Sequence, residues 1–176
     1  VPEDLDSEII SSGKIFHVSG ITPALSESCR ETTFEALRIA KKNKVLVSFD
    51  TNYRKKLWSE SDARPILLQI AKQSDILMTD PDDARILLGK TPGESGETLK
   101  QLRALGPSTV VYKLGATRGL AALSNEEKAT SAAIKVPIVD SIGAGDAVVA
   151  GFLAGYVRGD SLQRSLDMAA VCSALT

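Results

Sequence analysis

The sequence predicts an α/β fold in which a mostly parallel sheet carries helices on both faces. Short apolar segments typical of buried strands alternate with helical segments along nearly the whole chain. Polar residues follow several of these strand segments, as they do at the ligand-binding edge of open parallel sheets. No repeat and no linker interrupts the alternation, so we expect one domain over residues 1–176.

The elements are expected in a regular order. A strand near Lys14–Val18 precedes a helix near Ser26–Asn43, whose buried stripe recurs every three or four residues: Cys29, Thr33, Ala36, Leu37 and Ala40. The later elements are a strand at Val45–Phe49, a helix near Asp62–Gln73, a strand at Ile76–Thr79, helices near Asp82–Leu88 and Glu97–Leu105, a hairpin over Thr109–Leu123, a strand near Ala133–Val136, and helices from Gly143 and Ser161.

Composition excludes several classes of function. The chain is 43% hydrophobic and 24% charged, with 21 Lys and Arg against 22 Asp and Glu, so it lacks the basic footprint of a nucleic-acid-binding protein. No apolar run is long enough for a membrane span, and the first residues lack the pattern of a signal peptide. We therefore expect a soluble, cytoplasmic protein with no nucleic-acid or membrane partner.

The cysteines and the single histidine carry little chemistry in this pattern. Cys29 and Cys172 lie far apart in helical segments, which indicates neither a disulfide framework nor a metal site. His17 falls in the first predicted strand, where a structural role or a place at the edge of a crevice is expected. A Ser-His-Asp mechanism therefore has little support.

The turn before the late apolar helix is the most informative feature for function. Val139–Asp146 contains two glycines and runs into the apolar segment Ala147–Ala154. The first N–H groups of a helix lack intrahelical acceptors, and the helix dipole adds partial positive charge, so an anion is expected here. A carboxylate beside bound phosphate is repelled unless it takes a proton from the group being phosphorylated, which is the role we expect for Asp146. The alternative is an ordinary loop in which the aspartate caps the helix.

Residues Asp140–Asp146 resemble the D-T-x-G-A-G-D signature of the ribokinase-like (PfkB) sugar kinases, with Ser141 at the threonine position. The resemblance implies a three-layer sandwich and transfer of phosphate from ATP with Mg²⁺. It implies that Asp146 deprotonates the sugar hydroxyl. It also implies an anion hole for the transferring phosphoryl group on the backbone of Gly143, Ala144 and Gly145.

A second segment, Val45–Trp58, predicts a buried strand that ends in polar side chains. Asp50, Asn52 and Arg54 follow or close this strand, where the ligand crevice of a parallel sheet lies. The planar fork of Arg54 suits a carboxylate or a phosphate. An arginine at such a place is also often a solvated or ion-paired surface residue, and spacing alone leaves that alternative open.

The same segment contains F-D-x-N-x-R-x-x-L-W, which is similar to the 2-keto-3-deoxygluconate kinases, and every lettered position matches. The resemblance implies that Arg54 contacts the carboxylate of an acid sugar and that Asp50, Asn52 and Asp146 share the substrate site. Thr51 stands where that group has proline, which changes the stiffness of the turn and no reactive group.

Two further segments bear on ATP and magnesium. Asp80 and Asp83 align with the N-x-x-E element that helps to hold Mg²⁺ and water in the family, and both residues differ from it. Asp83 keeps a hard oxygen ligand, so the resemblance implies that it contacts Mg²⁺ through water. The aspartates equally suit the first turn of a helix. The hairpin over Thr109–Leu123 resembles the K-x-G-x-x-G turn that lies along the nucleotide, which implies nucleotide contacts for Lys113, Gly115 and Gly119.

The resemblance covers the central and C-terminal part of the family, whose members are commonly about 300 residues long. The N-terminal strands and the β lid of the family have no counterpart in this sequence, so we expect either part of a longer kinase or a degenerate relative. The full-length kinase is expected to be a homo-oligomer, because lid contacts often make dimers. The 176 residues alone are expected to fold poorly and to have little kinase activity.

Other functions remain possible from the sequence. Within the family, a fructokinase-like, ribokinase-like or nucleoside kinase is the main alternative to an acid-sugar kinase. A noncatalytic ligand-binding relative is compatible with the departures at Ser141, Asp80 and Asp83. A nicotinamide-dependent oxidoreductase is disfavoured, because no G-x-G-x-x-G opens a helix after an early strand.

Overall fold

The computed structural model describes residues 1–125, 127–137 and 140–176. In this part of the chain the strands form one sheet of six, in the order β1-β2-β3-β4-β5-β6. Strands β1 to β4 are parallel, and β5 and β6 are antiparallel to their neighbours. The strands are β1 Ile15–Ser19, β2 Leu46–Asp50, β3 Ile76–Thr79, β4 Thr109–Lys113, β5 Leu120–Ser124 and β6 Glu127–Ser131. The prediction of a mostly parallel sheet is confirmed.

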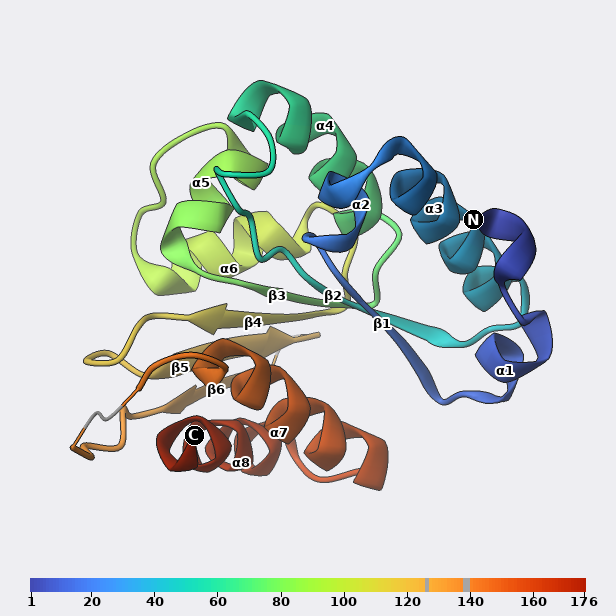
Figure 1. Ribbon diagram of the computed structural model, residues 1–176. Helices are drawn as coiled ribbons and strands as arrows, with labels where there is room; N and C mark the ends of the chain where they lie inside the picture. Colours follow the sequence, from blue (N-terminus) through green and yellow to red (C-terminus); the bar gives the residue numbers. More distant parts are fainter. Residues whose placement is uncertain (126, 138–139) are drawn as a thin grey trace.

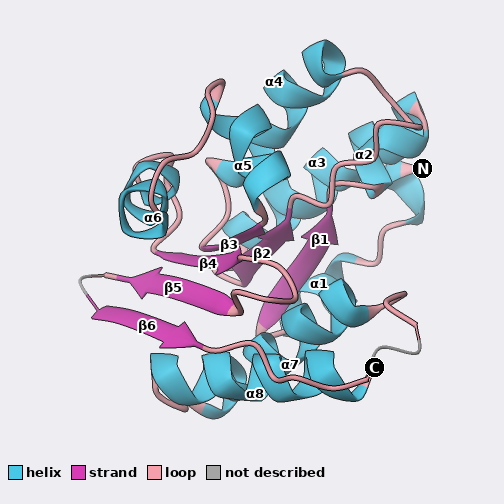
Figure 2. Ribbon diagram, turned by 90° about the vertical axis from the view of Figure 1, so that its left-hand side faces the viewer, coloured by secondary structure: helices cyan, strands magenta, loops and turns pink. Residues whose placement is uncertain are grey.

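Helices cover both faces of this sheet, which gives three layers (Figure 1). Helices α3 to α6 lie on one face, and α7 and α8 lie on the other, as the turned view in Figure 2 also shows. The helices are α1 Ser7–Ser12, α2 Thr22–Leu25, α3 Glu27–Lys42, α4 Glu60–Ala71, α5 Pro81–Leu88, α6 Ser95–Arg103, α7 Ala144–Arg158 and α8 Leu162–Leu175, after a 3₁₀ turn at Pro2–Asp4. None of the helices in the described ranges is long and apolar enough to cross a membrane.

Local signals in the sequence account for the helix bounds. The Ser26 side chain accepts a hydrogen bond from Cys29 N at 3.0 Å, which caps the start of α3. The helix buries Thr33, Ala36, Leu37 and Ala40 of the predicted stripe together with Ile39, whereas Cys29 is only half-buried. Helix α5 has its N-cap at Asp80 and its C-cap at Gly89, whose φ of 68° lies in the left-handed region.

One predicted strand is wrong. Residues 133–136 form no strand, and the sheet instead ends with β6 at Glu127–Ser131. The alternation of Ile134 and Val136 had indicated a strand, but these side chains are 45% and 43% exposed and line a pocket. Pro137 lacks a backbone N–H for a ladder, which is one reason why the pairing does not continue.

The two faces of the sheet differ in chemistry. Alternate residues of the strands point to opposite faces, and the face under α3 to α6 is apolar from β1 to β5. The buried apolar residues on the other face come from β3 to β6, where α7 and α8 pack, and Ile15 of β1 packs against them. The strand register also brings polar side chains to this second face, on β1, on β2 and at the end of β4. We call this group the polar end of the second face; it consists of His17, Ser48, Asp50 and Lys113.

Candidate active site

The turn before α7 leads into the first backbone N–H groups of the helix, of which Ala144 N donates to the carbonyl of Ser141 at 3.3 Å. Gly143 is the N-cap of α7 with a φ of 84°, a left-handed conformation that favours glycine. The Asp140 side chain accepts a hydrogen bond from Ile142 N at 2.9 Å, which orders the loop before it. A side chain at Gly145 would meet no atom within 4 Å, so space for a ligand lies directly over the first turn. Asp146 follows on the same turn and is exposed to solvent.

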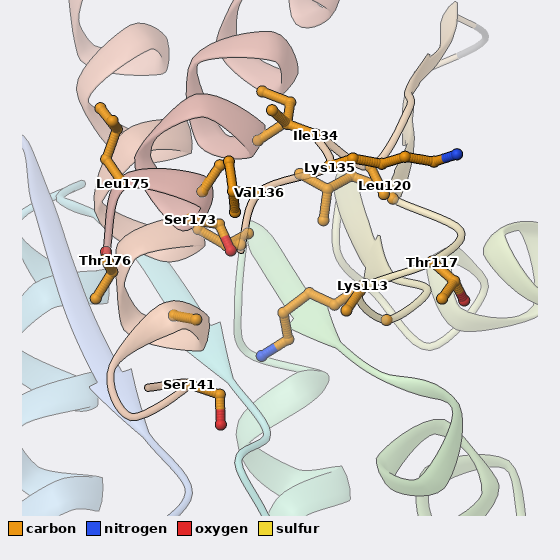
Figure 3. Close-up of a pocket in the computed structure, with 18 of the residues that line it drawn as sticks. Lys113, Thr117, Leu120, Ile134, Lys135, Val136, Ser141, Ser173, Leu175 and Thr176 are labelled. Atoms are coloured by element: carbon orange, nitrogen blue, oxygen red, sulfur yellow. The ribbon is translucent and has the colours of Figure 1, made fainter. Parts of the chain in front are cut away.

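A pocket of about 580 Å³ opens beside this turn. Its walls are the turn between β4 and β5, the segment after β6, the start of α7 and the end of α8 (Figure 3). Ala144 and Gly145 line it on one side, and Gly115 and Gly119 line it on the other. A volume of this order suits a nucleotide-sized ligand.

The β4–β5 hairpin allows close packing at the pocket wall. Gly119 has a φ of 78°, and a Cβ there would lie 2.1 Å from the carbonyl oxygen of Ser131. Gly115 also has a positive φ, of 92°, but faces open space. Leu114 N donates to the carbonyl of Gly119 at 2.9 Å, which closes the turn between them. The predicted hairpin is confirmed, whereas contact of its glycines with a nucleotide stays a prediction.

Lys113 connects the pocket to the C-terminal edge of the parallel strands. Its ammonium donates to Oδ1 of Asp50 at 2.7 Å, and the two side chains are only 16% and 3% exposed. Figure 3 shows Lys113 reaching toward the segment that carries Ser141, whereas Lys135 extends away from it. Burial raises the pKa of Asp50 above its usual value, and Lys113 opposes that rise by favouring the charged form.

His17 lies in the same electrostatic environment. Its Nδ1 is 3.1 Å from Oγ of Ser48 on the neighbouring strand. Partial removal from water lowers the pKa of His17, while the carboxylates of Asp50 and Asp146 act in the opposite direction. The strand register thus gathers an acid, a lysine and a histidine near Asp146, a grouping that the linear sequence did not reveal.

The Thr51–Arg54 turn leaves β2 on the way to α4. Asn52 adopts a left-handed conformation with a φ of 38° and donates from Nδ2 to Oγ of Ser19 at 3.3 Å. Tyr53 donates from its hydroxyl to the carbonyl of Trp58 at 3.0 Å. The Arg54 side chain is exposed, and no hydrogen bond or ion pair of it is found among the described residues. Arg54 is therefore available for an anionic ligand.

Asp83 faces this turn from α5. It is 5% exposed, and its Oδ2 accepts hydrogen bonds from Oγ1 of Thr51 at 2.7 Å and from N of Tyr53 at 3.1 Å. Burial, with the nearby Asp80 carboxylate as the second cause, raises the pKa of Asp83 to about 6. The described residues contain no group of three His, Cys, Asp or Glu side chains that could hold a metal ion. The water-mediated contact of Asp83 with Mg²⁺ stays a prediction.

The structure thus sorts the predicted site residues into two groups. Lys113, Gly115, Gly119, Ala144 and Gly145 line the pocket, with Gly143 and Asp146 at the same helix start. Asn52 and Arg54 lie on the turn that Asp83 holds, while Asp50 joins the two groups through Lys113.

Comparison with known proteins identifies the family. The model of the pfkB family of carbohydrate kinases matches residues 2–176. The chain belongs to the pfkB family of carbohydrate kinases. It is 42% identical over 176 residues to the 2-dehydro-3-deoxygluconokinase of Thermoproteus tenax and 35% identical over 175 residues to the 2-dehydro-3-deoxygalactonokinase of Haloferax volcanii. These matches cover 99% of the chain in each case, but 52% and 54% of the relatives, so the pfkB chain spans about half of their length.

Solved structures agree with this family. The 2-dehydro-3-deoxygluconokinase of Thermotoga maritima superimposes with a TM-score of 0.90 at 27% identity, over 99% of the pfkB chain and 58% of its own. A putative ribokinase II of E. coli in complex with ATP and Mg²⁺ gives a TM-score of 0.88 at 25% identity, over 99% and 55%. The ribokinase-like fold expected from the sequence is confirmed.

Proposed function

We propose that the protein transfers the γ-phosphoryl group of ATP, with Mg²⁺, to the terminal hydroxyl of 2-keto-3-deoxygluconate or its galactonate epimer. The products are the 6-phosphate and ADP. The observation that carries this proposal is the start of α7, where an exposed Asp146 stands one residue from a glycine that lines a nucleotide-sized pocket. Two relatives named for these acid sugars support the choice of substrate.

The phosphoryl transfer follows from the groups around this turn. Asp146 takes the proton of the attacking hydroxyl, so that the oxygen develops charge only as it bonds to phosphorus. The backbone N–H groups at Gly143, Ala144 and Gly145 stabilise negative charge on the phosphoryl oxygens. Lys113 supports the phosphates from the opposite wall, and the turn between Gly115 and Gly119 lies along the nucleotide.

The acid-sugar end of the site is assigned to the Thr51–Arg54 turn. The Arg54 guanidinium, which is exposed and without a protein partner in the described ranges, clamps the carboxylate of the sugar. Asn52 supports the sugar from the same turn. Asp50 is 2% exposed and paired with Lys113, so its contribution to the substrate site passes through that lysine.

Magnesium fits this site as a partner of the phosphates. Mg²⁺ prefers hard oxygen ligands and usually keeps several waters, which agrees with carboxylates nearby and no dense ligand cluster in the described part of the chain. A contact of Asp83 with Mg²⁺, through water, is the alternative to a structural role, since its Oδ2 already accepts two hydrogen bonds from the Thr51–Arg54 turn. When bound, Mg²⁺ supplies charge that offsets the negative phosphates.

The test is ADP release by the protein expressed from its complete reading frame, assayed with a panel of acid and neutral sugars. We expect the highest kcat/KM for 2-keto-3-deoxygluconate or its epimer, and a loss of about 10²-fold on Arg54→Met with acid sugars alone. Equal turnover of sugars that lack a carboxylate would overturn the acid-sugar proposal and leave the family intact.

Two alternatives are decided by the same panel. Preference for fructose, ribose or a nucleoside would indicate the neutral-acceptor branch, which solved neighbours such as the fructokinase of Vibrio cholerae represent, with a TM-score of 0.80. Binding of ligand without release of ADP would indicate a noncatalytic relative.

A further inference from the structure

The Thr51–Arg54 turn has an unusual anchor for a loop that presents a ligand-binding arginine. Thr51 is fully buried, although it follows the last residue of β2, and its N donates to the carbonyl of Met78 on the next strand at 3.0 Å. The following residue, Asn52, takes a φ of 38°, which costs free energy for a side chain other than glycine. A conformation of this kind persists only where its surroundings hold it.

The carboxylate of Asp83 supplies that restraint from the neighbouring helix. Its Oδ2 accepts from the Thr51 hydroxyl at 2.7 Å and from the Tyr53 N–H at 3.1 Å, so the two bonds bracket the left-handed residue between them. Asp83 is itself placed by the N-cap of α5, since its N donates to Oδ1 of Asp80 at 2.9 Å. Asp83 therefore links the capped start of α5 to the turn.

We propose that Asp83 is a positioning residue for the acceptor sugar: its carboxylate shapes the Thr51–Arg54 turn and thereby aims the Arg54 guanidinium at the carboxylate of the substrate. The inference rests on the proposed function for the identity of the ligand. The hydrogen bonds by which Asp83 holds the turn do not depend on which ligand binds. It assigns Asp83 to the acceptor end of the site, whereas a metal-binding role assigns it to the phosphate end.

The two roles move different kinetic constants. Loss of positioning raises the KM for the acid sugar and leaves the KM for ATP and the Mg²⁺ concentration of half-maximal activity unchanged. Loss of a magnesium contact does the reverse. An asparagine keeps one oxygen that can accept both hydrogen bonds, so it retains the shape of the turn while removing the charge.

The experiment uses the variants T51V, D83A and D83N in the protein expressed from its complete reading frame. D82N, which removes an exposed carboxylate on the adjacent residue of α5, is the matched control. We expect T51V and D83A to raise the KM for the acid sugar about tenfold, with D83N and D82N within about threefold of wild type and the Mg²⁺ requirement unchanged throughout. A raised Mg²⁺ requirement in D83N with an unchanged sugar KM in T51V would overturn the proposal.

A second measurement is independent of kinase activity. Arg54, Lys55 and Lys56 are exposed trypsin sites at the end of the turn, so their cleavage rate reports its order. We expect about fivefold faster cleavage at these sites in T51V and D83A than in D82N, with equal rates at Lys100 on α6. Unchanged cleavage overturns the inference even if acid-sugar kinase activity is found, and faster cleavage supports it even if that activity is absent. Should D83A not fold, T51V keeps the shape of threonine and carries both tests.

Discussion

The two faces of the central sheet are covered to different extents, and the difference locates the function. The face under α3 to α6 is filled with apolar side chains from five strands and includes Val47, Phe49 and Leu77, none of which is exposed. The buried apolar residues of the opposite face come from β3 to β6 and pack under α7 and α8, with Ile15 of β1 at their margin. Both faces therefore contribute to the core, but only the second also carries the polar side chains of β1, β2 and the end of β4.

Strand β2 carries this contrast within one segment. Val47 and Phe49 belong to the apolar face, while Ser48 and Asp50 alternate with them toward the polar end of the second face. Buried polar groups lower stability unless they are hydrogen-bonded. Natural sequences therefore keep such residues mostly where they contact a ligand or a partner. The comparison makes four predictions for the protein expressed from its complete reading frame, given from the largest expected effect to the smallest.

Asp146→Asn is the strongest test of the polar end. If Asp146 is the base, turnover falls by about 10²- to 10⁴-fold, because the hydroxyl proton has no acceptor, while ATP affinity changes little. Steady-state kinetics and calorimetric ATP titration measure the two quantities. Asp167→Asn, a change of the same kind on α8, is the control, and near-normal turnover of the Asp146 variant would remove this residue from catalysis.

Phe49→Ala and Ser48→Ala compare adjacent residues that face opposite sides. Phe49 is fully buried under the helices, so its truncation is expected to lower the free energy of unfolding by about 3–5 kcal/mol. Ser48→Ala removes one hydrogen-bonding contact to His17 and is expected to cost about 1 kcal/mol. Urea unfolding measures both, and equal losses would contradict the division between the faces.

Lys113→Met leaves Asp50 buried without its cation. We expect a loss of about 3 kcal/mol in the free energy of unfolding and a higher KM for ATP, because both the ion pair and the proposed phosphate contact are lost. Adding Asp50→Asn is expected to recover most of the stability, since the uncompensated charge disappears, but not the ATP affinity if Lys113 holds the phosphates as proposed. Additive losses in the double variant would show that the two residues act independently.

Asp83 is buried without an ion-pair partner in the described part of the chain, so it is expected to make the stability of the protein depend on pH. The pKa of Asp83 is raised to about 6, whereas an unfolded aspartate titrates near about 3.9. The folded protein therefore binds this proton more tightly, and its stability falls as pH rises from about 4 to about 6 and levels off above. The loss from this group is about 3 kcal/mol and is absent in Asp83→Asn. Urea unfolding across this pH range with a chelator present measures it; parallel curves for the two proteins would contradict the assignment.

Much of the fold was readable because its signals are local. Strand β3 has the predicted bounds, and α3 lies within one residue of its predicted bounds, with Ser26 as its N-cap. Strand β6 was not predicted, since its Glu127 and Lys128 are exposed and it alternates too weakly to indicate a strand. Conversely, the apolar alternation of Ile134 and Val136 serves a pocket instead of a sheet.

The candidate site was predictable as separate motifs but not as a constellation. Each motif lies within a few residues, whereas the Asp50–Lys113 pair joins positions 63 residues apart and the Thr51–Asp83 bond joins positions 32 apart. Such contacts depend on strand order and register, which periodicity alone does not determine. The one available signal was that Asp50 and Lys113 both end parallel strands, because such ends meet at one edge.

The turn between β4 and β5 has a consequence for engineering the nucleotide preference of the proposed kinase. Gly115–Gly119 is closed at its base by backbone bonds from Leu114 and Gly119, while Ala116 and Thr117 are exposed and line the pocket. These two side chains contribute little to the stability of the fold. A library randomised at both positions can therefore be screened for the use of GTP in place of ATP without first adding stabilising substitutions.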